Sequence, residues 1–458
     1  MERTDESQTG LGQLADFAAH LDLSAVDPSD VLHMKYDLLD SVGCALYGST
    51  TPWARIVQRY ATKVGGTKDA AIWGTKLRWT CGSATLANGT AAQSLELDNS
   101  HTPLGLHLGC SIVPAAIAVA ERQDSTGREL LEALTVGYEV AIRIRGAMDI
   151  SHILKGFNST GTCSGFGAAA AAGRLLGLDA ERICNAMGIV GTYSVGLQSA
   201  QFSMAKRLLG PRIAEGGLLA AFLAEDGYTG TPNLLEAELG GFFRSLSDVY
   251  DPARVTAGLG KELRVKGMGI KPYPSSHGTH AALDAGKALR EKYGINPQQI
   301  REITVSLPPH AAKTKVGWKA TDIPSALHDV RFTLAVMLLK GDFFVEHVRD
   351  EVFADPAVQR LMELIKIVPE PAFGDSLETR WTGQVKIRMS DGKVLESDVI
   401  WHPKGTPANP VTPDEIAQKF MKLAAPILGE KRGDAIREYI VNLDSDSGVR
   451  GLTELMRA

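Results

Sequence analysis

Apolar and small residues recur every three or four positions through the first part of the chain, which is the spacing of one face of an α-helix. Residues 129–147 follow this pattern, and so do residues 30–46, which Asp27 or Ser29 can cap at the N-terminal end. Alanine and glycine dominate Gly165–Gly173, so this helix allows neighbouring backbones to approach closely. The pattern predicts a helical bundle with this segment near its centre.

The pattern changes near Val265. The sequence predicts a helix over residues 279–293, and apolar residues then alternate along 303–307 as in a half-buried strand. Residues 385–400 alternate on both sides of an Asp-Gly turn, which predicts a β-hairpin. The sequence at 412–415 has the spacing of a helical capping box. The order of helical, mixed and helical segments therefore predicts a mostly α fold in which a smaller α/β domain is inserted into a large all-helical domain.

Composition narrows the classes of function. The chain has 458 residues, with 48 Lys+Arg against 53 Asp+Glu, and this balance argues against a nucleic-acid or anionic-membrane partner. The longest apolar run, Ile112 to Ala120, is too short to cross a bilayer. The N-terminus lacks the pattern of a signal peptide. The five cysteines show no Cys-x-x-Cys spacing, so we expect reduced thiols in a soluble cytoplasmic protein.

The densest polar cluster lies just before the apolar segment at 111–120. It contains Glu96, Asp98, Asn99, Ser100, His101 and His107. Imidazole moves protons near neutral pH, and a carboxylate beside it fixes its tautomer and raises its basicity. A solvated, capped loop is the alternative interpretation. A metal site is a third, although the sequence has no His-Glu-x-x-His motif.

A second candidate site is the segment 271–280, with the sequence KPYPSSHGTH. Two prolines stiffen the chain before a predicted helix start, where free amides and partial positive charge bind carboxylate or phosphate. Candidate ligands to an anion here are Lys271, Ser275, Ser276, His277 and His280. The alternative is a structural turn. Phosphate is the less favoured anion, because the chain has no Walker loop or dinucleotide-binding fingerprint in the required context.

A third candidate is the adjacent pair Lys206 and Arg207. Such a pair usually lies on a solvated helix face. Here the neighbouring residues are apolar and small, which favours a helix near the interior.

These motifs together resemble the MmgE/PrpD family, whose members include 2-methylcitrate dehydratase, cis-aconitate decarboxylase and iminodisuccinate epimerase. The resemblance extends over nearly the whole chain. Its markers are LDSVGCAL at 39–46, the segment 88–107, GTCSGFG at 161–167, the segment 271–280 and LAVMLLKG at 334–341.

The resemblance implies a helical domain at 1–265 and 405–458, an α/β lid domain at 266–404, and a homodimer. It also implies catalysis without metal or organic cofactor on small di- or tricarboxylates. The family's acidic, hydroxyl and histidine positions fall on Glu96, Asp98, Ser100 and His107, with His101 resembling an extra histidine of fungal members. Its lysines fall on Lys206 and Lys271, and its lid position falls on Ser276.

Three positions depart from the family pattern. Asn99 replaces a common Asp, Asn158 replaces a frequent His, and Phe332 replaces the Tyr of some decarboxylases. The changes at Asn99 and Asn158 remove a carboxylate and an imidazole that could have taken part in acid–base chemistry.

The expected function is that of a cofactor-independent lyase that transfers a proton at a carbon next to a carboxylate. Dehydration is the first form of this hypothesis and decarboxylation the second. In either form His107 or His101 moves the proton, Asp98 or Glu96 orients the ring, and cations together with the 275–276 turn hold the substrate. The alternatives are an epimerase or racemase of an imino- or amino-dicarboxylate and a non-catalytic binding protein.

Overall fold

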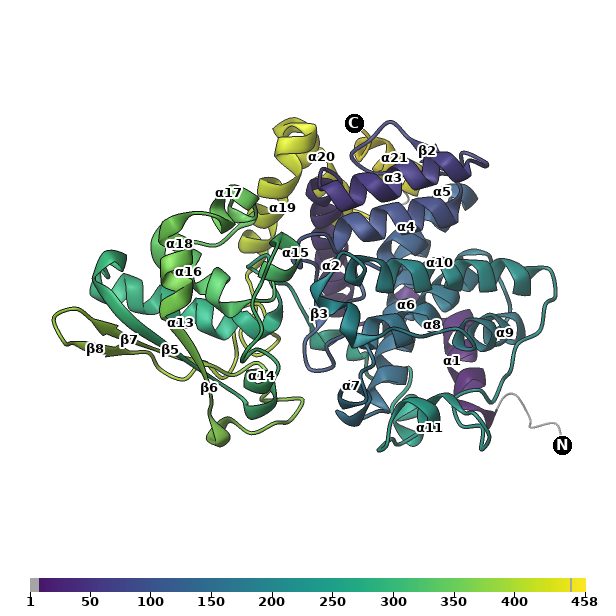
Figure 1. Cartoon of the computed structure of the whole chain (residues 1–458). Helices are drawn as coiled ribbons and strands as arrows, with labels where there is room; N and C mark the ends of the chain where they lie inside the picture. The colour runs from purple at the N-terminus through teal and green to yellow at the C-terminus, as the bar shows by residue number, and fades with distance from the viewer. Residues whose placement is uncertain (1–7, 445–446) are drawn as a thin grey trace.

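The structure is a computed structural model that describes residues 8–444 and 447–458. It confirms the mostly α fold: a large helical domain lies beside a smaller α/β domain (Figure 1). The first part of the large domain contains α1 (Gly10–His20), η2 (Leu23–Ala25), α2 (Pro28–Gly48), α3 (Pro52–Val64), β1 (Ala70–Ala71), β2 (Arg78–Trp79), α4 (Cys81–Ala92), β3 (Ser100–His101), α5 (Ile112–Gln123) and α6 (Gly127–Gly146). It continues with α7 (Ser151–Leu154), α8 (Ser159–Leu175), α9 (Ala180–Gly191), η3 (Gln198–Phe202), α10 (Lys206–Glu225), α11 (Phe242–Leu246), α12 (Ala253–Thr256), η4 (Arg264–Gly267) and β4 (Met268–Gly269).

The centre of the large domain is α8, which packs against α5, α6, α9 and α10. Its small residues permit this, because a Cβ added at Gly167 would lie 2.2 Å from the carbonyl oxygen of Gly137 on α6. Likewise, a Cβ at Gly217 on α10 would lie 2.7 Å from the carbonyl oxygen of Gly165. The alanine- and glycine-rich segment therefore does what its sequence predicts, and it fixes the N-terminal ends of α8 and α10 beside each other.

The smaller domain contains α13 (His277–Tyr293), η5 (Pro297–Gln299), β5 (Ile300–Leu307), α14 (Pro309–Lys313), α15 (Ile323–Ala326), α16 (Val330–Lys340), η6 (Val345–His347), α17 (Asp350–Phe353), α18 (Pro356–Leu364), β6 (Ile365–Pro369), η7 (Pro371–Phe373), β7 (Gln384–Met389) and β8 (Val394–Glu396). The strand order is β6-β5-β7-β8, with β5 parallel to β6 and antiparallel to β7. Alternation along β5 buries Ile303, Val305 and Leu307 as predicted, and these side chains share a core with α13, α16 and α18. The predicted hairpin is present as β7 and β8.

The chain then returns to the large domain through α19 (Pro413–Leu428), α20 (Glu430–Val441) and α21 (Val449–Leu455). The capping box at Thr412 and Glu415 starts α19 as predicted. Both α19 and α20 pack against α2, and α21 packs against α5. From α19, Lys419 Nζ lies 2.5 Å from Asp40 Oδ1 and donates to the carbonyl oxygen of Leu97 at 2.9 Å. The domain boundaries at 265/266 and 404/405 stay predictions.

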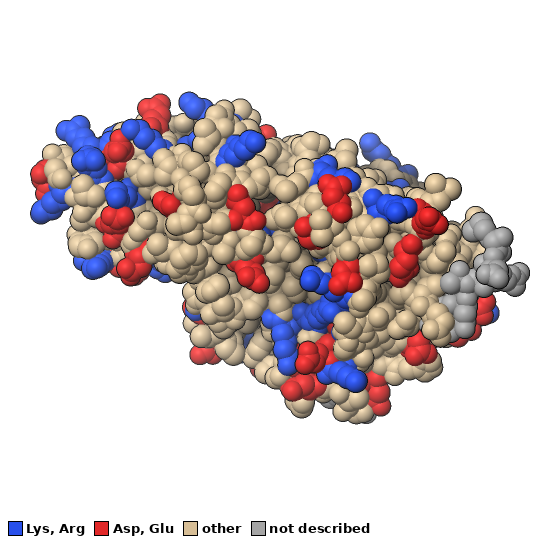
Figure 2. Space-filling view, turned by 90° about the horizontal axis from the view of Figure 1, so that it is seen from below, with Lys and Arg blue, Asp and Glu red and all other residues tan. Residues whose placement is uncertain are grey.

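Acidic and basic side chains are interspersed over the face seen in Figure 2, as the near balance of charges suggests. All five cysteines are buried and unpaired with one another. No helix in the described part of the chain is long and apolar enough to span a membrane.

Candidate active site

A polar pocket lies where the two domains meet. Its lining combines large-domain residues with residues that follow β4 and residues from the smaller domain. The lining residues are Glu96, Ser100, Gly105, His107, Ile153, Asn158, Ser159, Gln198, Gln201, Lys206, Lys271, Ser276, His277, His328, Arg380 and Trp381. The pocket is narrow, with a cavity volume of about 70 Å³. The structure thus brings His107, Lys206 and Lys271 into one site, although the first and last are far apart in sequence.

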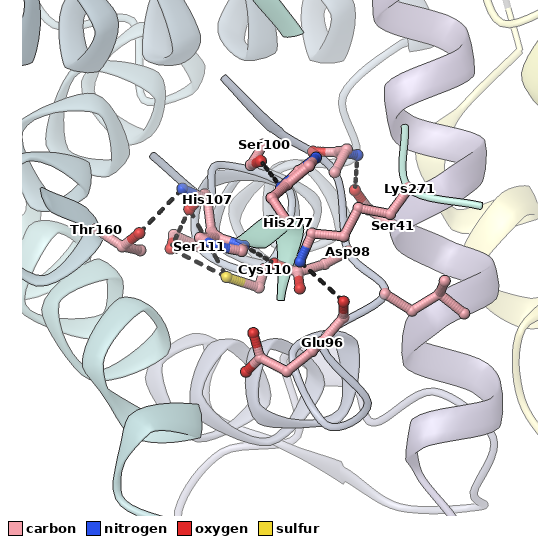
Figure 3. A network of polar contacts seen from close by, with 12 residues as sticks. Ser41, Glu96, Asp98, Ser100, His107, Cys110, Ser111, Thr160, Lys271 and His277 are labelled. Carbon is pink, nitrogen blue, oxygen red and sulfur yellow. Dashed lines mark hydrogen bonds and ion pairs between the residues drawn. The ribbon is translucent and has the colours of Figure 1, made fainter. Parts of the chain in front are cut away.

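His107 and Asp98 form a dyad at this pocket (Figure 3). His107 Nδ1 lies 2.9 Å from Asp98 Oδ2, and the backbone N–H of His107 donates to Thr160 Oγ1 on α8 at 2.9 Å. Burial opposes the charge of Asp98, but His107, Lys271 and Lys206 together lower its pKa, so Asp98 is ionised. An ionised carboxylate only accepts hydrogen bonds, so Nδ1 of His107 carries the proton and Nε2 keeps its lone pair.

The protonation state of His107 depends on two opposing influences. Burial lowers its pKa, and so do the charges of Lys206 and Lys271, whereas Asp98 raises it; the net shift is downward. In the free protein His107 is therefore neutral at neutral pH. A bound polyanion would raise the pKa of His107, because an opposite charge nearby favours the protonated ring.

Glu96 is the most heavily paired acid of the site. Lys206 Nζ lies 2.6 Å from Glu96 Oε1 and 2.5 Å from Oε2. His328 Nε2 and Arg207 Nη2 lie 3.7 and 3.9 Å from Oε1. Burial opposes the charge, but Lys206 and the other nearby cations hold the pKa of Glu96 well below its usual range.

The backbone at Glu96 is in the left-handed region, with φ of 55°. This conformation is uncommon for a residue with a side chain. It turns the chain so that Leu95 and Leu97, on either side, join an apolar cluster shared with Ile323, Phe344 and Val345 of the smaller domain. One turn of chain therefore carries both the acid of the site and part of the contact between the domains.

Lys271 enters the pocket from the segment that follows β4. Its Nζ donates to the carbonyl oxygen of Glu96 at 2.8 Å, and the whole residue is buried (Figure 3). Burial lowers the pKa of Lys271, although Asp98 and Glu96 act in the opposite direction. The backbone hydrogen bond fixes the position of the ammonium group beside the dyad.

His277 faces Ser100 and an aromatic neighbour. Its Nδ1 lies 3.4 Å from Ser100 Oγ, and its ring lies 5.6 Å from that of Trp381. Burial and the neighbouring His280 hold the pKa of His277 well below its usual range, so the ring is neutral. Ser100 and His277, both predicted from sequence, thus meet across the domain boundary.

Several predicted residues lie outside the pocket lining. The ring of His101 packs onto the glycine at 267, where an added Cβ would lie 2.1 Å from Nε2. Ser275 Oγ is hydrogen-bonded to Thr279 Oγ1, and His280 Nε2 lies 3.2 Å from the carbonyl oxygen of Ser275. The side chains of Ser275 and His280 therefore stabilise the start of α13 through these hydrogen bonds. Arg207 also lies outside the lining, where its Nη1 donates to the carbonyl oxygen of Ser203.

One sequence-based interpretation needs correction. The amides of Ser275 and Ser276 donate to the carbonyl oxygens of Tyr273 and Leu327, so these amides are not free to bind an anion. By contrast, Lys206 and Arg207 do not lie on the solvated face that such a pair usually occupies: both are buried at the start of α10, as their apolar and small neighbours indicated.

The three departures from the family pattern fall in different places. Asn158 lines the pocket, but its Oδ1 accepts from the amides of Thr160 and Gly161 and so caps α8. Asn99 is buried outside the lining and donates to the carbonyl oxygen of Asp37. Phe332 lies in the core of the smaller domain and not at the pocket.

Arg380, Trp381, His328 and Gln201 are among the lining residues that sequence reasoning missed. Each comes from a segment without a recognisable motif, and only the fold brings them to the pocket. Among residues 8–444 and 447–458, no group of three or more His, Cys, Asp and Glu side chains is arranged to hold a metal ion.

Comparisons with known proteins agree on one family. Residues 12–254 match the MmgE/PrpD N-terminal domain, and residues 273–445 match the MmgE/PrpD C-terminal domain. The chain is 29% identical to a cis-aconitate decarboxylase-like protein of Aspergillus oryzae, covering 100% of this chain and 99% of that protein. It is 28% identical to a cis-aconitate decarboxylase of Aspergillus terreus, covering 94% and 92%. A 2-methylcitrate dehydratase of Cupriavidus necator is 21% identical over 51% of this chain and 50% of that protein.

The pairing of Glu96 generates a stability prediction. Replacing Glu96 by Gln keeps the size of the side chain but leaves Lys206 and Arg207 without their carboxylate partner. We expect the free energy of unfolding to fall by about 3–5 kcal/mol, because an uncompensated buried charge is costly. Thermal unfolding followed by fluorescence measures the change.

The matched control for this measurement is Glu302→Gln in the exposed pair with Lys366 on the smaller domain. This control should unfold at the wild-type temperature, because exposed ion pairs add little stability. Equal unfolding temperatures for Glu96→Gln and wild type would contradict the role assigned to Glu96.

Proposed function

The chain belongs to the MmgE/PrpD family, and from this membership we propose that it is a lyase for small polycarboxylates that works without metal or organic cofactor. The observation that carries the proposal is the convergence of the His107–Asp98 dyad with Lys206 and Lys271 in one buried pocket. A dyad of this kind moves a proton, and the two ammonium groups offset the charge of carboxylates.

Within this class we propose decarboxylation of an unsaturated tricarboxylate of the cis-aconitate type. Relatives named cis-aconitate decarboxylase match this chain over more than nine-tenths of its length, whereas the relative named 2-methylcitrate dehydratase matches over about half. The preference for dehydration that the sequence suggested is therefore reversed.

The chemistry of this reaction needs one proton donor. The departing carboxylate is attached to the carbon next to a carbon–carbon double bond. When its bond to that carbon breaks, the electron pair forms a new double bond and carbon dioxide leaves. The pair of the old double bond then takes a proton at a carbon that carries another carboxylate, so one proton is consumed for each carbon dioxide released.

We assign the donor to His107. Binding of a trianion raises the pKa of His107, which loads the ring with a proton. Asp98 stabilises the resulting imidazolium through Nδ1, and Nε2 delivers the proton to carbon. Lys271 and Lys206 hold carboxylates beside the dyad, and water has little access because the pocket is narrow and buried.

Dehydration remains the second candidate, because a relative carries that activity in its name. It requires His107 to remove a proton and a further group to protonate the departing hydroxyl. Epimerisation of an imino- or amino-dicarboxylate and a purely binding role are the remaining alternatives.

We further propose that the protein is a cytoplasmic homodimer. All five cysteines lie in the described part of the chain and none forms a disulfide with another, which suits a reducing compartment. An exposed apolar surface on α10 and the segment before it, formed by Val195, Leu197, Leu208 and Leu219, is suited to a second copy of the chain. A solution mass of one chain by light scattering would exclude the dimer.

A mass-spectrometric screen tests the reaction. Purified protein is incubated with cis-aconitate, citrate, 2-methylcitrate and iminodisuccinate in deuterium oxide. Decarboxylation removes about 44 mass units, dehydration removes about 18, and epimerisation only introduces deuterium. We expect loss of carbon dioxide from cis-aconitate, with deuterium in the product.

The same screen tests His107. Replacing His107 by Gln should reduce turnover by roughly 10²-fold or more, because a positioned acid is lost. His310→Gln, an exposed histidine on the smaller domain, is the matched control and should retain full activity. Undiminished turnover in His107→Gln would exclude the proposed donor.

The pH profile of kcat distinguishes the two directions of proton transfer. Asp98→Asn removes the charge that raises the pKa of His107, so this pKa falls further. If His107 donates a proton, the loss of activity on the alkaline side moves to lower pH. If His107 removes a proton, the loss on the acidic side moves to lower pH instead. We expect the alkaline side to move, and movement of the acidic side would support dehydration or epimerisation.

A further inference from the structure

The segment between β6 and β7 reaches from the smaller domain back to the pocket. Near its end, Trp381 Nε1 donates to the carbonyl oxygen of Thr102 in the large domain at 2.9 Å. The preceding residue, Arg380, is one of the pocket-lining residues, so the contact at Trp381 fixes a guanidinium group at the pocket.

Arg380 differs from the other cations of the site in its partners. Lys206 is paired with Glu96, and Lys271 donates to the carbonyl oxygen of the same residue. By contrast, among the residues that the structure describes, no carboxylate lies within ion-pair distance of Arg380. Its Nη1 is shielded from solvent and has no hydrogen-bond partner there.

The position of Arg380 is nevertheless well defined. Its Cζ lies 4.2 Å from the centre of the Trp381 ring. On another side it lies against Gly105, where an added Cβ would be 3.2 Å from Nη1. The residue at 105 has φ of 62°, a conformation that glycine adopts without strain. An aromatic ring and a bare backbone hold the guanidinium, which leaves its donors free.

The charges at the site are not balanced. Two carboxylates, those of Glu96 and Asp98, lie in or directly behind the pocket. They are outnumbered by four cationic side chains, those of Lys206, Arg207, Lys271 and Arg380. Burial and the nearby Arg145 lower the pKa of Arg380 to about 9, which leaves it charged at neutral pH. Arg380 is half-buried, but its Nη1 is shielded from solvent and has no partner among the described residues, and leaving such a donor unsatisfied is costly. The arrangement therefore favours an anion that arrives from outside.

We propose that Arg380 binds one carboxylate of the substrate through two parallel N–H···O bonds, while Lys206 and Lys271 hold a second carboxylate beside His107. A planar guanidinium matches a carboxylate in this way, and an ammonium group does not. The inference rests on the proposed function, because the ligand is the same polycarboxylate. It adds a binding residue supplied by the smaller domain, so substrate binding joins the two domains directly.

Binding of an unreactive ligand tests this inference separately from turnover. Tricarballylate is a saturated tricarboxylate with no double bond, so it can bind but cannot lose carbon dioxide by the route above. Isothermal titration calorimetry gives its Kd for wild type, Arg380→Gln, Arg380→Lys and the control Arg388→Gln, which changes an exposed arginine on β7.

We expect the Kd to rise roughly 10- to 100-fold in Arg380→Gln, the range for losing hydrogen bonds to a charged group. Arg380→Lys should recover only part of the affinity, and Arg388→Gln should match wild type. In Arg380→Ala, millimolar guanidinium chloride should restore affinity by occupying the vacated space. Unfolding temperatures show whether each variant is folded. If Arg380→Gln does not fold, the affinity of Arg380→Lys is compared with wild type instead.

The outcomes separate this inference from the proposed function. If wild type binds tricarballylate and the folded Arg380 variants bind it within threefold of wild type, the assignment of Arg380 is overturned and the proposed lyase is unaffected. If wild type neither binds a polycarboxylate nor turns one over, the proposed function is overturned and the assignment falls with it.

Discussion

The buried carboxylate of Glu96 is the constraint on which the site depends. A carboxylate removed from water needs cations and hydrogen-bond donors around it. Lys206 and Arg207 come from the start of α10, His328 comes from the smaller domain, and Lys271 holds the backbone of Glu96 itself. Because these partners belong to different parts of the fold, they meet only when the two domains are in place. The same charge that stabilises the fold therefore also sets the position of the ammonium groups beside the dyad.

Local sequence predicted the elements well, because their signals lie within a few residues. Alternation along 303–307 marked a strand, the Thr412–Glu415 spacing marked a helix start, and the small residues of 165–173 marked a central helix. The exact partners of these elements depend on packing between distant segments. Sequence order alone indicated that one domain is inserted in the other, and the return of α19 to α2 required the structure.

The same distinction applies to the site. His107 and Asp98 are close in sequence, so their pairing could be predicted from a cluster of polar residues. Arg380 could not, because a single arginine in a long connection carries no periodicity or spacing. The histidines at 101 and 280 show the opposite case. Both are imidazoles in segments that contribute other residues to the pocket, so the sequence predicted them as site residues. Packing against the backbone directs them away from the pocket.

The contacts of Lys419 have a consequence for how the protein is made. This residue bonds to Asp40 and to the backbone of Leu97, so the loop that carries Glu96 and Asp98 is held by a helix from the last part of the chain. A ribosome synthesises the dyad early and this support late. While the chain is still growing, Asp40 lacks its cation and the loop lacks its final hydrogen bond. The pocket is therefore completed only after α19 has left the ribosome. Until then, Glu96 and Asp98 are present in the growing chain, but Lys419 is not yet there to hold their loop in position.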